Sequence, residues 1–113
     1  MKKLTALLIL FSLFIFCSAS AQKIYKCDSK YDAKIKVYSA DSKYDADLVV
    51  YSCDSKYDAE GNNGLWWFAD SKYDAEFTVW FADSKYDADL IIYFADSKYD
   101  AGWRSNTKKY LLE

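Results

Sequence analysis

The hexapeptide Asp-Ser-Lys-Tyr-Asp-Ala at residues 28–33 decides the fold of this chain, because the chain repeats it. Five further copies begin at Asp41, Asp54, Asp70, Asp83 and Asp96, with successive spacings of 13, 13, 16, 13 and 13 residues. Repeats this regular indicate one supersecondary unit per copy, with neighbouring units stacked on each other. The sequence therefore predicts a small repeat protein.

The segments between the copies are apolar, β-branched and aromatic, which is typical of strands. They are residues 35–38, 48–51, 77–80 and 90–93. An alternation that begins in the hexapeptide predicts one continuous face formed by Ser42, Tyr44, Ala46, Leu48 and Val50. No helical period persists, so the prediction is an all-β fold, a meander or small solenoid on the pattern alone.

An odd repeat length requires a corner in every copy, because side chains along a strand alternate with period two. The sequence places this corner at Ala-Asp-Ser, where an Asp carboxylate can accept from a backbone N–H two residues on. The predicted turn residues are Asp28, Asp41, Asp54, Asp70, Asp83 and Asp96. The one irregularity is residues 60–64, Glu-Gly-Asn-Asn-Gly, which divide the chain into two halves of three repeats related by an offset of 42 residues. We expect a loop there, with glycine at positions of positive φ.

The beginning of the chain predicts a signal peptide over residues 1–21. Lys2 and Lys3 precede an apolar run over residues 4–16, and Ala19-Ser20-Ala21 is a small-residue cleavage site. Phe16 before Cys17 argues against lipidation. We expect cleavage after Ala21 and a secreted or periplasmic protein.

The 92 residues after Ala21 predict one domain, residues 22–113. They carry 13 basic and 17 acidic residues, which argues against a nucleic-acid partner, and no later segment can span a membrane. Cys27 and Cys53 occupy the repeat position where other copies have Ala, so we expect two small buried residues in preference to a disulfide. Their pairing stays open on the sequence.

Two stretches that extend beyond the hexapeptides carry a resemblance to a known family. Residues 61–68, Gly-Asn-Asn-Gly-Leu-Trp-Trp-Phe, and residues 101–104, Ala-Gly-Trp-Arg, followed by Lys108-Lys109, resemble the septoil-knot domain family from about Lys23 onward. The resemblance implies a small all-β fold with a seven-crossing knot, and no established activity. It also implies that the second half lies beside the first, each repeat pairing with its counterpart 42 residues on.

The composition excludes several chemistries. The chain has no histidine, which removes Ser-His-Asp and Cys-His nucleophilic sites and histidine-ligated zinc. Each hexapeptide Asp has equivalents in similar surroundings, whereas acid–base catalysis needs carboxylates in different ones. We therefore expect no catalytic residues, no cofactor and no enzyme activity. Calcium binding by the repeated Asp is an alternative, but Asp–Lys cross-strand ion pairs on a wetted face are the preferred interpretation.

The aromatic residues form two repeated sets. We expect the first set to pack the core with hydroxyls at its rim: Tyr31, Tyr44, Tyr57, Tyr73, Tyr86 and Tyr99. The second set consists of Tyr25, Tyr38, Tyr51, Trp67, Trp80 and Tyr93. It is either buried by the wrapped chain or exposed as a row that stacks on sugar rings or a protein. The candidate binding residues are Trp66, Trp67, Trp80 and Trp103.

The end of the chain, residues 105–113, leaves the repeat, and we expect it to dock through Tyr110-Leu111-Leu112 and cover a sheet edge. The sequence as a whole predicts a structural module that unfolds slowly in a protease-rich environment. The alternative is a glycan- or protein-binding module, or cation binding by Asp. Partners stay unassigned, and a homo-oligomer is left open.

Overall fold

The computed structural model describes residues 21–113; the predicted signal peptide, apart from Ala21, and Cys17 lie outside the described residues. The strands are β1 (Lys23–Lys26), β2 (Ile35–Ser39), β3 (Leu48–Ser52), β4 (Leu65–Phe68), β5 (Phe77–Phe81), β6 (Leu90–Phe94) and β7 (Gly102–Trp103). The 3-10 helices are η1 (Lys43–Asp45), η2 (Lys56–Asp58), η3 (Lys72–Asp74), η4 (Lys85–Asp87), η5 (Lys98–Asp100) and η6 (Asn106–Leu112). Within residues 21–113, none of the helices has the length and apolar character needed to cross a membrane.

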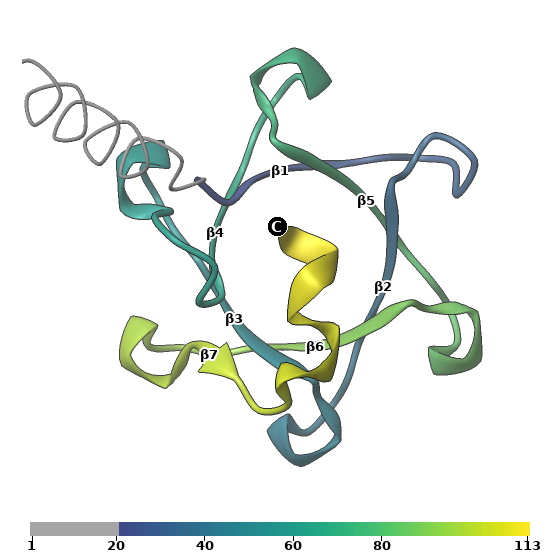
Figure 1. Ribbon diagram of the computed structural model, residues 1–113. Helices are drawn as coiled ribbons and strands as arrows, with labels where there is room; N and C mark the ends of the chain where they lie inside the picture. Colours follow the sequence, from purple (N-terminus) through teal and green to yellow (C-terminus); the bar gives the residue numbers. More distant parts are fainter. Residues whose placement is uncertain (1–20) are drawn as a thin grey trace, which may run out of the picture.

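Six strands form a closed sheet, with the hexapeptides projecting outward from it (Figure 1). The order is β4-β1-β5-β2-β6-β3, and β3 pairs with β4 to close the ring. All six strands are parallel, and the short β7 adds antiparallel to β3. The all-β repeat fold is therefore confirmed. Parallel strands exclude a meander, since each needs a crossover to return the chain to the starting end.

The two halves interleave around the ring. Each strand of the second half, β4, β5 or β6, lies between two strands of the first half. The predicted pairing of counterparts is confirmed for β1 with β4, β2 with β5 and β3 with β6. The aligned residues are 44 apart, as in Ile35 with Val79, so the strands are offset by two residues from the sequence repeat. Each second-half strand also pairs with the other flanking first-half strand, as β5 does with β1.

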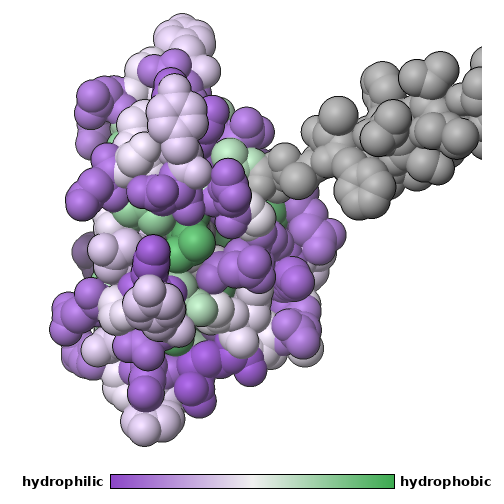
Figure 2. All heavy atoms as spheres, turned by 90° about the vertical axis from the view of Figure 1, so that its left-hand side faces the viewer, coloured by the Kyte–Doolittle hydropathy of each residue, from purple (hydrophilic) through white to green (hydrophobic). Residues whose placement is uncertain are grey.

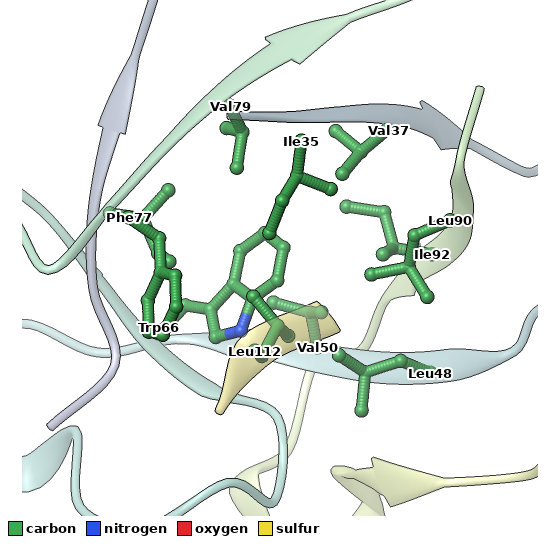
Figure 3. Packing of buried hydrophobic residues seen from close by; sticks show 11 residues of the cluster. Ile35, Val37, Leu48, Val50, Trp66, Phe77, Val79, Leu90, Ile92 and Leu112 are labelled. Atoms are coloured by element: carbon green, nitrogen blue, oxygen red, sulfur yellow. The ribbon is translucent and has the colours of Figure 1, made fainter. Parts of the chain in front are cut away.

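Alternate residues of the strands point into the ring and form the core, because a closed sheet has one interior face. In β2, for example, Ile35 and Val37 are buried, whereas Lys36 between them is partly exposed. Figure 3 shows these side chains converging from the strands and from η6. The members of the core are Ile24, Ile35, Val37, Leu48, Val50, Trp66, Phe77, Val79, Leu90, Ile92 and Leu112.

One end of the ring is filled by three phenylalanines that occupy the same repeat position in the second half. The rings of Phe68, Phe81 and Phe94 lie 6.2–6.5 Å apart, centroid to centroid. At this position the first half has Lys26, Ser39 and Ser52. The three rings, one on every second strand, fill this end of the ring of strands. The Lys26 ammonium lies over the Phe81 ring, with its Nζ 5.0 Å from the ring centroid.

The other end of the ring is filled by the end of the chain. Helix η6 enters the interior of the ring (Figure 1). Leu112 is fully buried there, and its backbone carbonyl accepts a hydrogen bond from the side-chain amide of Gln22 at 3.3 Å. The expectation that residues 105–113 dock is confirmed, but the expectation that they cover an edge is wrong. A closed sheet has an apolar interior that side chains have to fill, and Leu112 packs into this interior.

The loop between the halves has the predicted character. Gly61 and Gly64 have φ of 70° and 88°, in the left-handed region. The side-chain amide of Asn62 donates to the backbone carbonyl of Lys109, so this loop also holds helix η6, which we call the C-terminal plug.

Candidate functional site

The hexapeptide forms a tight turn and not a strand. In η4, for example, the Ser84 hydroxyl accepts from the Tyr86 N–H at 3.2 Å, and the following residues make a single 3-10 turn. The same bond from Tyr N–H to Ser hydroxyl recurs in all six copies. The prediction that Asp28, Asp41, Asp54, Asp70, Asp83 and Asp96 make the turn is therefore wrong. The serine does so, since its short hydroxyl reaches a backbone N–H two residues on.

The hexapeptide tyrosines lie outside the core, contrary to prediction. Tyr31, Tyr44, Tyr57, Tyr73, Tyr86 and Tyr99 are 74–88% exposed. The expected face from Ser42 to Val50 fails for the same reason, because η1 interrupts it and β3 begins only at Leu48. Each turn sits on the outside of the ring, so its tyrosine projects away from the sheet. In Figure 2 the side of the molecule is largely hydrophilic, and apolar residues show between the projections.

The hexapeptide lysines cover the neighbouring tyrosines instead of pairing with Asp. In every copy the Lys Nζ lies 5.4–5.6 Å from the centroid of the following Tyr ring. Across residues 21–113 the one ion pair joins Lys108 to Asp47 at 3.4 Å. The predicted Asp–Lys ladder is thus wrong. The turn holds the Lys side chain against the Tyr that follows it. The copies are not paired as strands, so Asp and Lys of different copies do not lie opposite each other.

Between neighbouring turns the surface is hollowed, and we call each such hollow a rim groove. The first lies over β1: Tyr25 projects outward from the strand, Asp28 and Asp32 come from the turn that follows it, and residues 70–73 come from the turn that follows β4. Equivalent grooves lie at Tyr38, Tyr51 and Tyr93. Their volumes are about 470, 420, 460 and 320 Å³. These volumes suit a side chain or a small ligand.

Each rim groove carries an excess of negative charge. The first contains the carboxylates of Asp28, Asp32 and Asp70 against the single ammonium of Lys72. The other three repeat this ratio, because the same hexapeptide positions line them. Among residues 21–113, however, no three His, Cys, Asp or Glu side chains form a group able to hold a metal ion.

The second aromatic set lies on the outward face of the ring. Tyr25, Tyr38, Tyr51, Trp67, Trp80 and Tyr93 are all partly buried, since the hexapeptide turns pack against these strands. Trp67 and Trp80 therefore remain accessible in part. Trp66 is fully buried in the core, and its assignment as a binding residue is wrong. Trp103 is held in place by its indole N–H, which donates to the Asn62 carbonyl at 2.9 Å.

Cys27 and Cys53 are both buried and free, as the sequence favoured. Each lies at a rim groove, in the position that Ala40 and Ala95 take in the other two. Burial, followed by the charges of Asp32 and Asp58 respectively, raises the pKa of each thiol above its ordinary value. A buried thiol with a raised pKa is a poor nucleophile at neutral pH, so these residues serve packing.

The arrangement brings together aromatic faces, carboxylates and ammonium groups in repeated, open grooves. Aromatic rings and carboxylates in this arrangement offer stacking and charged contacts to a ligand. The six hexapeptide tyrosines, which the sequence predicts to pack the core, lie on the surface. The signal available was composition: Asp, Ser, Lys and Asp around one Tyr favour a turn over a strand.

The sequence model of a family described as "7(1) septoil knot domain" matches residues 21–104. No curated protein and no solved structure matches the chain.

Proposed function

The chain belongs to the 7(1) septoil knot domain family, and on that premise we propose that it is a non-enzymatic, secreted or periplasmic scaffold that unfolds slowly and presents its hexapeptide turns as a multivalent binding surface. The location follows from the expected signal peptide. The observation that carries the binding role is the exposure of all six hexapeptide tyrosines, at 74–88%.

The strand order supports slow unfolding. Among β1 to β6, no strand pairs with another strand of its own half, so neither half can form a sheet alone. The chain makes a second circuit between the strands of its first, and the family description expects this path to be knotted. To unfold fully, such a chain has to withdraw an end through its own path, which adds to the unfolding barrier.

The loop between the halves offers a test of this barrier. We insert a protease recognition site between the exposed Glu60 and the partly buried Gly61, and we compare the cut and uncut forms of the same variant. The cut form is expected to unfold at least about tenfold faster in guanidinium, because the halves can then separate without threading. Tryptophan fluorescence gives the rates. Equal rates for the two forms would contradict the slow-unfolding proposal.

The exposed tyrosines support binding because they lie outside the hydrophobic core. An exposed ring contributes little to the core, yet it offers an apolar face and a hydroxyl to a ligand. Repetition of one site on a rigid frame raises the affinity for a repetitive ligand well above that of one site.

A triple variant tests this role: Tyr73→Gln, Tyr86→Gln and Tyr99→Gln. The free energy of unfolding is expected to change by less than about 1.5 kcal/mol, because surface substitutions each contribute about 0.5 kcal/mol or less. On arrays of glycans and peptides, ligands retained by the wild-type chain are expected to bind the variant at least about tenfold more weakly.

The control is the matching triple change to Phe, which keeps the rings and is expected to keep the binding. If the Gln variant unfolds, the tyrosines are structural. If it binds all ligands as well as the wild-type chain does, the tyrosines are not the binding surface.

A further inference from the structure

One hexapeptide tyrosine lies beside a second cation in addition to its own lysine. Tyr44 has Lys43 over its ring at 5.6 Å, as every copy has its own lysine. In addition, the guanidinium carbon of Arg104 lies 5.3 Å from the centroid of the same ring. The backbone N–H of Arg104 donates to the backbone carbonyl of Asp47 at 2.9 Å. This hydrogen bond places the Arg104 side chain beside the turn that contains Tyr44. The fold therefore contains an example of a guanidinium bound to a hexapeptide tyrosine.

The other five tyrosines have only their own lysine. Over residues 21–113, no second cation lies over Tyr31, Tyr57, Tyr73, Tyr86 or Tyr99. The turns share one sequence, the same Ser-capped hydrogen bond and the same Lys-to-ring distance. The contact that Arg104 makes with Tyr44 therefore has no counterpart at the other five rings among the described residues.

The surroundings of three of these five rings favour a cation. Tyr73 and Tyr99 line grooves in which three carboxylates face one ammonium, and Tyr86 lines a third such groove. A guanidinium is the suitable cation, because it is planar, stacks on aromatic rings and offers hydrogen bonds to carboxylates. A neutral sugar could also stack on the ring, but it would leave the excess negative charge of the groove uncompensated.

We propose that the partner of this surface is an arginine-rich polypeptide segment, whose guanidinium groups stack on Tyr73, Tyr86 and Tyr99 and contact the Asp residues of the rim grooves that these tyrosines line. This inference rests on the proposed binding function and names its partner class. Each single contact is weak and screened by salt, so the binding comes from several contacts made together.

The arginine already in place makes the site testable residue by residue. The probe is N-acetyl-arginine methylamide, added in excess to a chain with labelled and assigned tyrosine rings, with ring chemical shifts as the readout. In the wild-type chain, Tyr73, Tyr86 and Tyr99 are expected to shift and Tyr44 is not. In Arg104→Ala, which removes an exposed side chain, Tyr44 is expected to join them, so four rings respond instead of three. If Tyr44 responds alike in both chains, or the other three rings do not respond, the site is wrong.

A second measurement tests the partner class. A peptide with six arginines separated by Gly-Ser is compared with the same peptide carrying citrulline, which is neutral and of nearly the same shape. The arginine peptide is expected to bind at least about tenfold more tightly at low salt and to lose this advantage at high salt. Equal binding of the two peptides would overturn the proposal. If neutral glycans bind and the arginine peptide does not, the partner class is wrong and the scaffold function stands. If nothing binds, both fail.

Discussion

Gly64→Ala is expected to lower the free energy of unfolding by on the order of 3–5 kcal/mol. Two costs add at this position. Gly64 has φ of 88°, where an L side chain is strained, and an added Cβ would lie 2.2 Å from the carbonyl oxygen of Val49. That oxygen belongs to β3, and the amide nitrogen of Gly102 would lie 3.1 Å from the same Cβ. Neither neighbour is a flexible side chain, so the junction between the halves has to move away from β3.

Gly61→Ala is the matched control for this prediction. Gly61 has a similar φ of 70°, but its added Cβ would meet only the side chain of Asn63, at 3.3 Å. The expected cost is about 1 kcal/mol, which is the conformational part alone. Equilibrium unfolding in guanidinium measures both values. If the two variants lose the same stability, the close approach of Gly64 to β3 does not limit the fold.

Trp66→Ala is expected to cost about 3–5 kcal/mol, the range for removing a large aromatic residue from a core. Trp66 is fully buried, and its ring meets that of Phe68 edge to face at 6.1 Å. Leu112 from the end of the chain belongs to the same cluster, so the cavity would also loosen the C-terminal plug (Figure 3). Thermal and guanidinium unfolding, followed by circular dichroism, measure the loss.

Two further substitutions separate the explanations. Trp67→Ala changes the next residue, which is only partly buried on the outside of the ring, and should cost less than half as much. Trp66→Phe should also cost less than Trp66→Ala, because the indole N–H of Trp66 has no hydrogen-bond partner within the described chain and a phenyl ring removes that buried donor. If Trp66→Ala and Trp67→Ala cost the same, Trp66 is not the core anchor that its burial indicates.

The wrong predictions about the tyrosines, the turn residues and the Asp–Lys ladder all concern the hexapeptide. Read with period two, Ser42 and Tyr44 continue the apolar alternation of Leu48 and Val50, and the prediction placed Tyr44 in the core. In the fold the Ser42 hydroxyl accepts from the Tyr44 N–H and ends that period. The same local hydrogen bond in each copy thus places the six tyrosines on the surface and not in the predicted core. The candidate site lies on the surface for the same reason.

The sequence alone determined the repeat, the strands between the copies, the division at residues 60–64 and the family, because each depends on local pattern. Only the tertiary structure decided that the six strands close into a ring, that η6 fills one end and that the tyrosines project outward. Six copies of one hexapeptide are locally the same, so nothing in them specifies which turn lies beside which strand. The closure of the ring decides which turn lies beside which strand, because a closed sheet has one interior face and all inward side chains have to fit inside it. Trp66, Phe68 and Leu112 pack together in this interior.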